Sequence, residues 1–135
     1  MPKITFLGAG STVFAKNVLG DVMATEALQD FELALFDIDP ERLRDSESIL
    51  NNIKKTLNSK CVIKSYSDRK EALRGAKYVV NAIQVGGYDP CTITDFEVPK
   101  KYGLRQTIAD TIGIGGIFRN LRTIPVMLDF ARDIR

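Results

Sequence analysis

Two glycines near the N-terminus have the spacing of a phosphate-binding turn. Gly8 and Gly10 follow a short apolar run, and Ser11 and Thr12 come directly after them. Such a turn lets the backbone approach a pyrophosphate, and the N–H groups at the start of the next helix favour a negative charge. The third glycine position of the usual fingerprint holds Val13. The spacing therefore predicts a dinucleotide phosphate site from an incomplete motif.

An acidic residue, Asp37, follows a second apolar run, Phe31–Phe36. A carboxylate at this point of a dinucleotide-binding fold can accept hydrogen bonds from both ribose hydroxyls of the adenosine. Because it would repel a 2′-phosphate, we expect the cofactor to be NAD and not NADP. Its separation from Gly10 exceeds the usual interval of about 20 residues, which predicts a long first helix and loop. We expect the nearby Asp39 mainly to cap the following helix.

Five further residues are candidates for ligand contacts. Asn81 ends the last predicted strand and is a candidate contact for NAD, and Gln84 and Gly86 follow it as candidate substrate contacts. The carboxyl edge of a doubly wound sheet borders the ligand crevice, which favours this assignment. Asp110 is a carboxylate beside a second glycine-rich turn, and Arg119 follows that turn. The alternatives are a loop glycine at Gly86, a helix cap at Asp110 and a solvated helix arginine at Arg119.

The elements that must position these residues alternate between strand and helix. Short apolar runs predict four strands, at Ile4–Leu7, Phe31–Phe36, around Val62–Ile63 and at Lys77–Ile83. The last run is apolar enough to be covered on both faces. This order predicts an α/β fold, a doubly wound, Rossmann-like parallel sheet with helices on both faces.

Helical spacing of apolar residues fills the intervals between the strands. The predicted helices run from Ser11 to about Ala27, from Asp39 to Asn58–Ser59, from Ser67 or Asp68 to Gly75, over part of Tyr88–Tyr102, and from about Gly116 onward with a bend or break at Pro125. The expected buried faces are Phe14, Val18, Val22 and Leu28 in the first, Leu43, Leu50, Ile53 and Leu57 in the second, and Ile117, Leu121, Ile124 and Leu128 in the last.

Composition narrows the classes of function. The 135 residues suit one domain, and we expect residues 1–135 to be an NAD-binding Rossmann domain, the N-terminal fragment of a longer enzyme, because the chain ends inside a helical pattern. There is no histidine, the commonest general base and metal ligand. The 19 basic and 17 acidic residues are spread evenly, which predicts no nucleic-acid partner.

No apolar run reaches the roughly 18 residues of a membrane span, and no leader pattern is present, so a cytoplasmic location is expected. Apolar surface exposed by truncation predicts self-association into a homo-oligomer.

Several motifs, taken together, resemble glycoside hydrolase family 4, and within it the α-galactosidase branch. The resemblance covers essentially the whole chain, in order and with compatible spacing. The residues that carry it are Gly8–Ser11, Leu35–Pro40, Gln84–Tyr88, Thr94–Glu97, Ile108–Thr111, Arg119 and Arg122–Pro125.

This resemblance implies a glycosidase that uses NAD and a divalent metal, typically Mn²⁺. It implies oxidation of the sugar at C3, removal of the C2 proton, elimination of the glycosidic oxygen, addition of water and return of the hydride. Gln84 and Gly87 stand where members that cleave 6-phosphoglycosides carry arginine and lysine, which implies an unphosphorylated α-galactoside such as melibiose. Asp110 matches an acidic position of the family's sugar pocket and is the candidate acid for the leaving oxygen. The metal ligands are expected beyond residue 135, so no metal ligand is assigned here and the fragment alone is expected to be inactive.

Two alternatives share the glycine turn. One is the nucleotide-binding domain of a lactate- or malate-dehydrogenase-like oxidoreductase, which would lack the pattern between Thr107 and Pro125. The other is a non-catalytic NAD-sensing module, which would explain the missing histidine.

Overall fold

The computed structural model describes residues 1–106 and 113–134. These residues form two compact units, Met1–Ile83 and Gln84–Arg135, which we describe separately. The predicted sheet lies in the first unit, and the described residues of the second unit form helices and loops. The assignment of all 135 residues to one NAD-binding domain stays a prediction.

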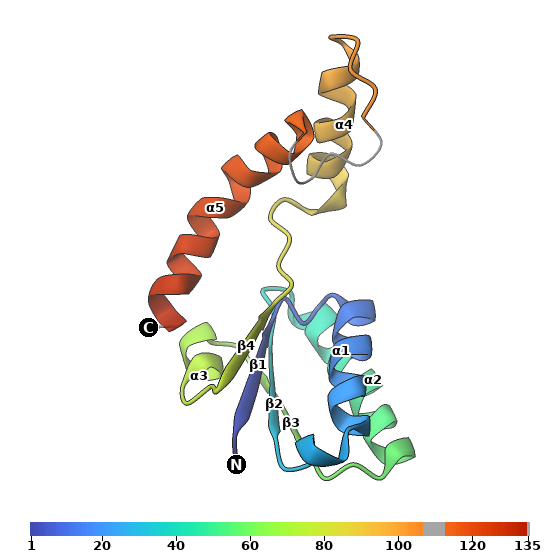
Figure 1. Cartoon of the computed structure of the whole chain (residues 1–135), viewed down its shortest axis with the longest axis vertical. Coiled ribbons are helices and arrows are strands. Elements are labelled where there is room, and N and C mark those ends of the chain that lie inside the picture. Colours follow the sequence, from blue (N-terminus) through green and yellow to red (C-terminus); the bar gives the residue numbers. More distant parts are fainter. Residues whose placement is uncertain (107–112, 135) are drawn as a thin grey trace. The chain divides into compact units, whose positions relative to one another are not determined.

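The first unit is built on a four-stranded parallel sheet (Figure 1). Its strands are β1 (Lys3–Leu7), β2 (Glu32–Phe36), β3 (Val62–Tyr66) and β4 (Tyr78–Asn81). The strand order is β3-β2-β1-β4, so the chain winds outward from β1 first on one side and then on the other. The predicted doubly wound, Rossmann-like sheet is confirmed, and parallel pairing brings the carboxyl ends of all four strands to one edge.

Helices cover both faces of this sheet, as predicted. Figure 1 shows α1 (Thr12–Ala24) and α2 (Pro40–Leu57) on one face and α3 (Arg69–Leu73) on the other. A short turn, η1 (Glu26–Leu28), follows α1. The Asp39 carboxylate caps α2 by accepting from two backbone N–H groups, so its predicted capping role is confirmed. Of the two possible caps of α3, Asp68 accepts from the N–H of Glu71.

The predicted buried face of α1 is partly wrong. The residues that pack into the core are Ala15, Leu19 and Met23, whereas Phe14 is 62% exposed. The predicted partners of Phe14, namely Val18, Val22 and Leu28, pack against the core only in part. A helix turns by about 100° per residue, so Phe14 lies on the face beside the one that Ala15 presents to the sheet.

Two other burial predictions also need correction. Strand β4 forms one edge of the described sheet, and Tyr78 is half exposed instead of covered on both faces. In α2, Leu43 and Leu50 are buried and Ile53 is partly buried. Leu57, in the last turn of α2, is exposed. Asn58 ends the helix there in a left-handed conformation.

A polar cluster lies at the sheet face that α3 covers. Lys3 is buried and donates to the carbonyl oxygens of Glu71 in α3 and of Arg74, which follows α3 directly. The Glu32 carboxylate accepts from Lys64 Nζ at 2.8 Å and from the Tyr66 hydroxyl at 2.7 Å, and Lys3 Nζ lies 3.8 Å away. The first unit therefore combines an apolar core on one face with a paired charge cluster on the other.

The second unit consists of the helical turn η2 (Gly87–Thr92), α4 (Ile93–Lys100) and α5 (Ile114–Ile134). Helix α5 continues through Pro125, so the predicted break is absent. The predicted apolar face of α5 is exposed in this unit, and its members are Ile117, Leu121, Ile124 and Leu128. Within residues 1–106 and 113–134, no helix is long and apolar enough to cross a membrane.

Candidate functional site

The first glycine turn follows β1 and is held by backbone contacts. The N–H groups of Gly8 and Ala9 both donate to the carbonyl oxygen of Phe36, at 2.9 and 3.0 Å. Gly8 has φ +86°, and a Cβ there would lie 2.7 Å from the carbonyl carbon and oxygen of Ala82. No side chain fits this position, so β1 leaves the sheet through a bare turn between β2 and β4.

Gly10 and Asp37 contact each other directly. The Gly10 N–H donates to Asp37 Oδ2 at 2.7 Å, and the Asp39 N–H donates to Oδ1 at 2.9 Å. A Cβ on Gly10 would lie 2.7 Å from the same Oδ2. The two backbone donors fix the carboxylate at the carboxyl end of β2, and each oxygen keeps a lone pair for a further donor such as a ribose hydroxyl.

Helix α1 begins immediately after the turn. Ser11 is its N-cap residue and makes no capping hydrogen bond with its side chain, and Thr12 is the first helical residue. The N–H groups of the first helical turn therefore provide a positive end beside the glycines. Val13 is 63% exposed, which explains why the missing third glycine does no harm. Here that position points away from the sheet, and Ala15 makes the close approach instead.

A pocket of about 670 Å³ lies beside Asp37 at the carboxyl ends of β2 and β3. This volume falls in the range of small-molecule sites. The sequence analysis did not identify its β3 side, although the rule that ligands bind at the carboxyl edge of a parallel sheet could have pointed there. The lining residues are Phe36, Asp37, Ile38, Pro40, Leu43, Arg44, Ser65, Tyr66 and Ser67.

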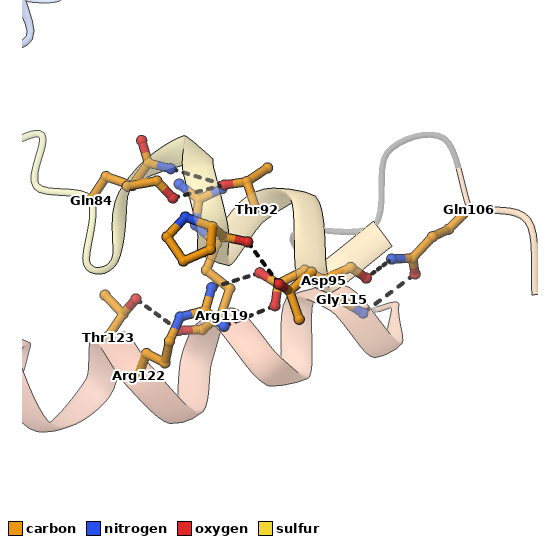
Figure 2. A network of polar contacts seen from close by, with 11 residues as sticks. Gln84, Thr92, Asp95, Gln106, Gly115, Arg119, Arg122 and Thr123 are labelled. Atoms are coloured by element: carbon orange, nitrogen blue, oxygen red, sulfur yellow. Dashed lines mark hydrogen bonds and ion pairs between the residues drawn. The ribbon is translucent and has the colours of Figure 1, made fainter. Parts of the chain in front are cut away.

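The candidate substrate residues of the second unit lie around η2 (Figure 2). Gln84 is exposed, and its Nε2 donates to Thr92 Oγ1 at 3.0 Å. The Thr92 hydroxyl in turn donates to the carbonyl oxygen of Gly87 at 3.4 Å. Gly86 has φ +88°, and a Cβ there would collide with Cys91 Sγ. Thr92 therefore connects Gln84 with Gly87 inside the loop, and the loop backbone at Gly86 lies close to Cys91.

An ion pair joins α4 to α5 beneath this loop. Arg122 Nη1 donates to Asp95 Oδ1 at 2.8 Å and Nη2 donates to Oδ2 at 2.6 Å (Figure 2). The Asp95 side chain is 7% exposed and that of Arg122 is 28% exposed. The hydrogen bonds to Asp95 raise the pKa of Arg122, although burial acts in the opposite direction. Sequence reasoning did not pair these residues, because only the packing of α4 on α5 brings them together.

The remaining candidates are placed less fully. Asn81 is the exposed last residue of β4, at the same sheet edge as Asp37. Arg119 lies on α5, and its carbonyl oxygen accepts from the Thr123 hydroxyl at 2.8 Å. Asp110 lies outside the described residues. Both cysteines are free thiols, and in the described part of the chain no three Asp, Glu, Cys or His side chains could hold a metal ion.

The chain is similar to curated sugar-cleaving enzymes over almost its whole length. It is 66% identical over 134 residues to an alpha-galactosidase from Bacillus subtilis, covering 99% of this chain and 31% of that protein. It is 39% identical to an alpha-galactosidase from Rhizobium meliloti, covering 98% of this chain and 27% of that protein. The chain thus spans about a third of the length of these relatives.

Solved structures agree with these matches. A 6-phospho-beta glucosidase from Thermotoga maritima, determined with manganese, NAD+ and glucose-6-phosphate, matches with a TM-score of 0.83 and 25% identity, covering 100% of this chain and 32% of that one. A 6-phospho-alpha-glucosidase from gut microorganisms, in complex with NAD and glucose-6-phosphate, matches with a TM-score of 0.83 and 28% identity, covering 98% and 30%. The model of the family 4 glycosyl hydrolases matches residues 3–135. The chain therefore belongs to family 4 of the glycosyl hydrolases.

Proposed function

We propose that this chain forms the cofactor-binding part of an NAD-dependent α-galactosidase that hydrolyses unphosphorylated α-galactosides. The observation that carries the proposal is the contact between Gly10 and Asp37. It fixes a carboxylate beside a bare glycine turn and a pocket at one edge of a parallel sheet. Such an arrangement is suited to a dinucleotide, and the glycosidases of family 4 are NAD-dependent.

The chemistry of the described residues suits NAD. The bare backbone of Gly8 and Gly10 and the first turn of α1 would hold the pyrophosphate. The Asp37 carboxylate would accept from the adenosine ribose, and the adjacent pocket would take the adenine ring. A negative charge at Asp37 favours NAD over NADP. When bound, NAD supplies reversible hydride transfer, which in the proposed cycle acts at C3 of the sugar.

Gln84 and Gly87 support an unphosphorylated substrate. A phosphate dianion is bound most strongly by arginine or lysine. In this loop the amide of Gln84 donates to the Thr92 hydroxyl, and Gly87 brings no side chain. A neutral amide can instead exchange hydrogen bonds with sugar hydroxyls. The two curated relatives described above are both named alpha-galactosidases, which supports the same substrate class.

Manganese enters the proposal only as a requirement of the whole enzyme. The described residues do not fit a metal site, since no three ligating side chains come together. We therefore assign no residue of this chain to the metal. Asp110 remains the proposed acid for the leaving oxygen, on the basis of the family resemblance alone.

The intact polypeptide encoded by the gene should be assayed on an aryl α-galactoside with NAD⁺ and Mn²⁺. We expect hydrolysis that disappears when either NAD⁺ or Mn²⁺ is withheld. The matched 6-phosphorylated substrate should react far more slowly, and residues 1–135 alone should show no turnover. Hydrolysis that survives removal of both additions would exclude the redox mechanism. Hydride transfer to free NAD⁺ from a hydroxy acid would favour the dehydrogenase alternative instead.

A further inference from the structure

Two candidate sugar contacts of the second unit belong to different segments. Gln84 lies in the loop before η2, and Arg119 lies on α5, one helical turn before Arg122. We infer that the Asp95–Arg122 ion pair is a positioning pair that fixes the Gln84 loop relative to α5 and so sets the geometry of galactoside binding. This inference rests on the function proposed above. It assigns no catalytic step to either residue.

Arg122 also lies close to the loop that it faces from α5. The position of the missing Cβ of Gly86 is 3.5 Å from Arg122 Nε and 2.9 Å from Cys91 Cβ. Among the described residues the Nε atom is buried and has no hydrogen-bond partner. Both Nη groups are engaged by Asp95, so the guanidinium plane is fixed, with its Nε edge near the place where a Gly86 side chain would stand.

Hydrogen bonds and a short stretch of chain connect the Gln84 loop to Asp95. The Gln84 amide is bonded to Thr92, and α4 begins at the next residue, with Asp95 in its first turn. On the other side of Asp95, Gln106 Nε2 donates to its main-chain oxygen at 2.8 Å, and Gln106 Oε1 accepts from the N–H of Gly115 at 3.3 Å. Asp95 is therefore connected to the Gln84 loop through the start of α4, and to the start of α5 through Gln106 (Figure 2).

The two hydrogen bonds from the Arg122 guanidinium group fix the orientation of Arg122 relative to the Asp95 carboxylate. Two parallel N–H···O bonds hold a carboxylate at a defined angle, whereas a lysine ammonium is a point charge on a flexible stem. Arg122→Lys therefore keeps the charge beside the buried Asp95 carboxylate but removes the orientation. A double variant, Asp95→Leu with Arg122→Met, removes both charges and leaves no unpaired carboxylate, an exchange that folded proteins often tolerate.

Both variants should be made in the intact enzyme and compared with Arg74→Lys. Arg74 forms an exposed ion pair with Glu71 in the first unit, so this control makes the same chemical change away from the loop. We expect Arg122→Lys and the double variant to raise KM for an aryl α-galactoside about tenfold, with a smaller change in kcat. The Kd for NAD⁺ should stay within about twofold of wild type in all three variants.

Hydrogen exchange of the 135-residue chain gives a readout that needs no activity. We expect peptides that cover residues 84–92 to exchange faster in Arg122→Lys and in the double variant, and not in Arg74→Lys. A double variant with wild-type KM and wild-type exchange would overturn the inference, as would a parallel loss of sugar and NAD⁺ binding. An inactive wild-type enzyme would instead overturn the proposed function, and with it the sugar-binding part of the inference.

Discussion

Gly8 and Gly86 have nearly the same backbone φ angle in two differently built units. Their φ angles are +86° and +88°, in the left-handed region that favours glycine. A Cβ on Gly8 would meet backbone atoms of Ala82 and Ile83, whereas a Cβ on Gly86 would meet the side chain of Cys91. The turn of the first unit is enclosed by main chain, and the loop of the second unit rests on side chains. The proposed nucleotide site therefore depends on strand positions, and the proposed sugar site depends on particular residues.

The two units also differ in the kind of side chain that packs inside them. In the first unit Phe6, Leu19 and Leu33 are fully buried between the sheet and its helices. In the second unit the buried Asp95 carboxylate pairs with the partly exposed Arg122, and the apolar face of α5 is exposed. An apolar core tolerates many sequences, whereas a bidentate ion pair requires two specific residues.

The largest effect that tests this comparison should come from Gly8→Ala. A methyl group there must move the backbone of Ala82 and Ile83, just after β4, and also adopts a strained φ, so we expect the free energy of unfolding to fall by about 2–4 kcal/mol. Gly86→Ala carries the same φ strain but can displace the Cys91 side chain, so its cost should be about 1–2 kcal/mol. Urea unfolding of both variants measures the difference.

Gly20→Ala provides the control for this pair. Gly20 lies inside α1, and a Cβ there would meet nothing within 4 Å. Alanine at such a helical position should stabilise the chain by about 0.5–1 kcal/mol. Equal losses for Gly8→Ala and Gly86→Ala would show that φ strain alone decides both, and the contrast between a main-chain and a side-chain enclosure would then be lost.

The sequence alone predicts the features of this fold that depend on local patterns, but not those that depend on tertiary packing. Strands, helices, the parallel order and the cap at Asp39 follow from short-range patterns, and all are present. The errors concern the break expected at Pro125, which is absent, and which face of an element is buried. Phe14 is exposed because Ala15, a small residue, takes the position nearest the sheet. Tyr78 is exposed because β4 has a neighbouring strand on only one side.

The contacts of the candidate site also fall into two groups, those that the sequence alone predicts and those that it does not. Gly8, Gly10 and Asp37 come together because turn chemistry and strand ends place them, and both features can be recognised locally. The pairing of Asp95 with Arg122 has no local signal, because the two residues lie 27 positions apart on different helices. The sequence analysis named Arg122 only among the residues that carry the family resemblance. Such pairs become visible only when the packing of the helices is known.

A smaller effect is expected from Asp37→Asn, measured as NAD⁺ binding to the 135-residue chain by calorimetry. The Asp37 carboxylate accepts from Gly10 and Asp39 and faces the pocket. An amide in its place loses the charge and half of the acceptor capacity. The Kd for NAD⁺ should rise by about 10- to 30-fold, and the preference for NAD⁺ over NADP⁺ should shrink.

Asp39→Asn is the matched control, the same substitution two residues further along. Asp39 caps α2 through the N–H groups of Glu41 and Arg42, and asparagine is an equally good cap. The Kd for NAD⁺ and the stability should both stay close to wild type. Equal weakening of NAD⁺ binding by the two substitutions would mean that general loss of acidic charge, and not the fixed position of Asp37, governs the site.

The smallest expected effect concerns Glu32, the charged centre of the polar cluster in the first unit. Burial raises the pKa of Glu32, but hydrogen bonds from Lys64 and Tyr66 and the charges of Lys64 and Lys3 outweigh it, so the pKa is lowered overall. A carboxyl group whose pKa is lower in the folded chain than in the unfolded chain stabilises the fold above the unfolded pKa. That contribution is lost as the pH falls through the folded pKa.

Glu32→Gln should therefore lower the free energy of unfolding by about 1 kcal/mol at pH 7, and by less as the pH is lowered from about 5 to about 3. The Glu32 side chain is only 17% exposed, so its ion pairs are screened less than those at the surface. Glu71→Gln, which removes an exposed pair with Arg74, should cost about 0.5 kcal/mol or less at pH 7. Urea unfolding at several pH values measures both. A difference between wild type and Glu32→Gln that is the same at pH 7 and at pH 3 would mean that packing, and not charge, gives Glu32 its role. The charges around Glu32 would then make no contribution to the stability of the first unit.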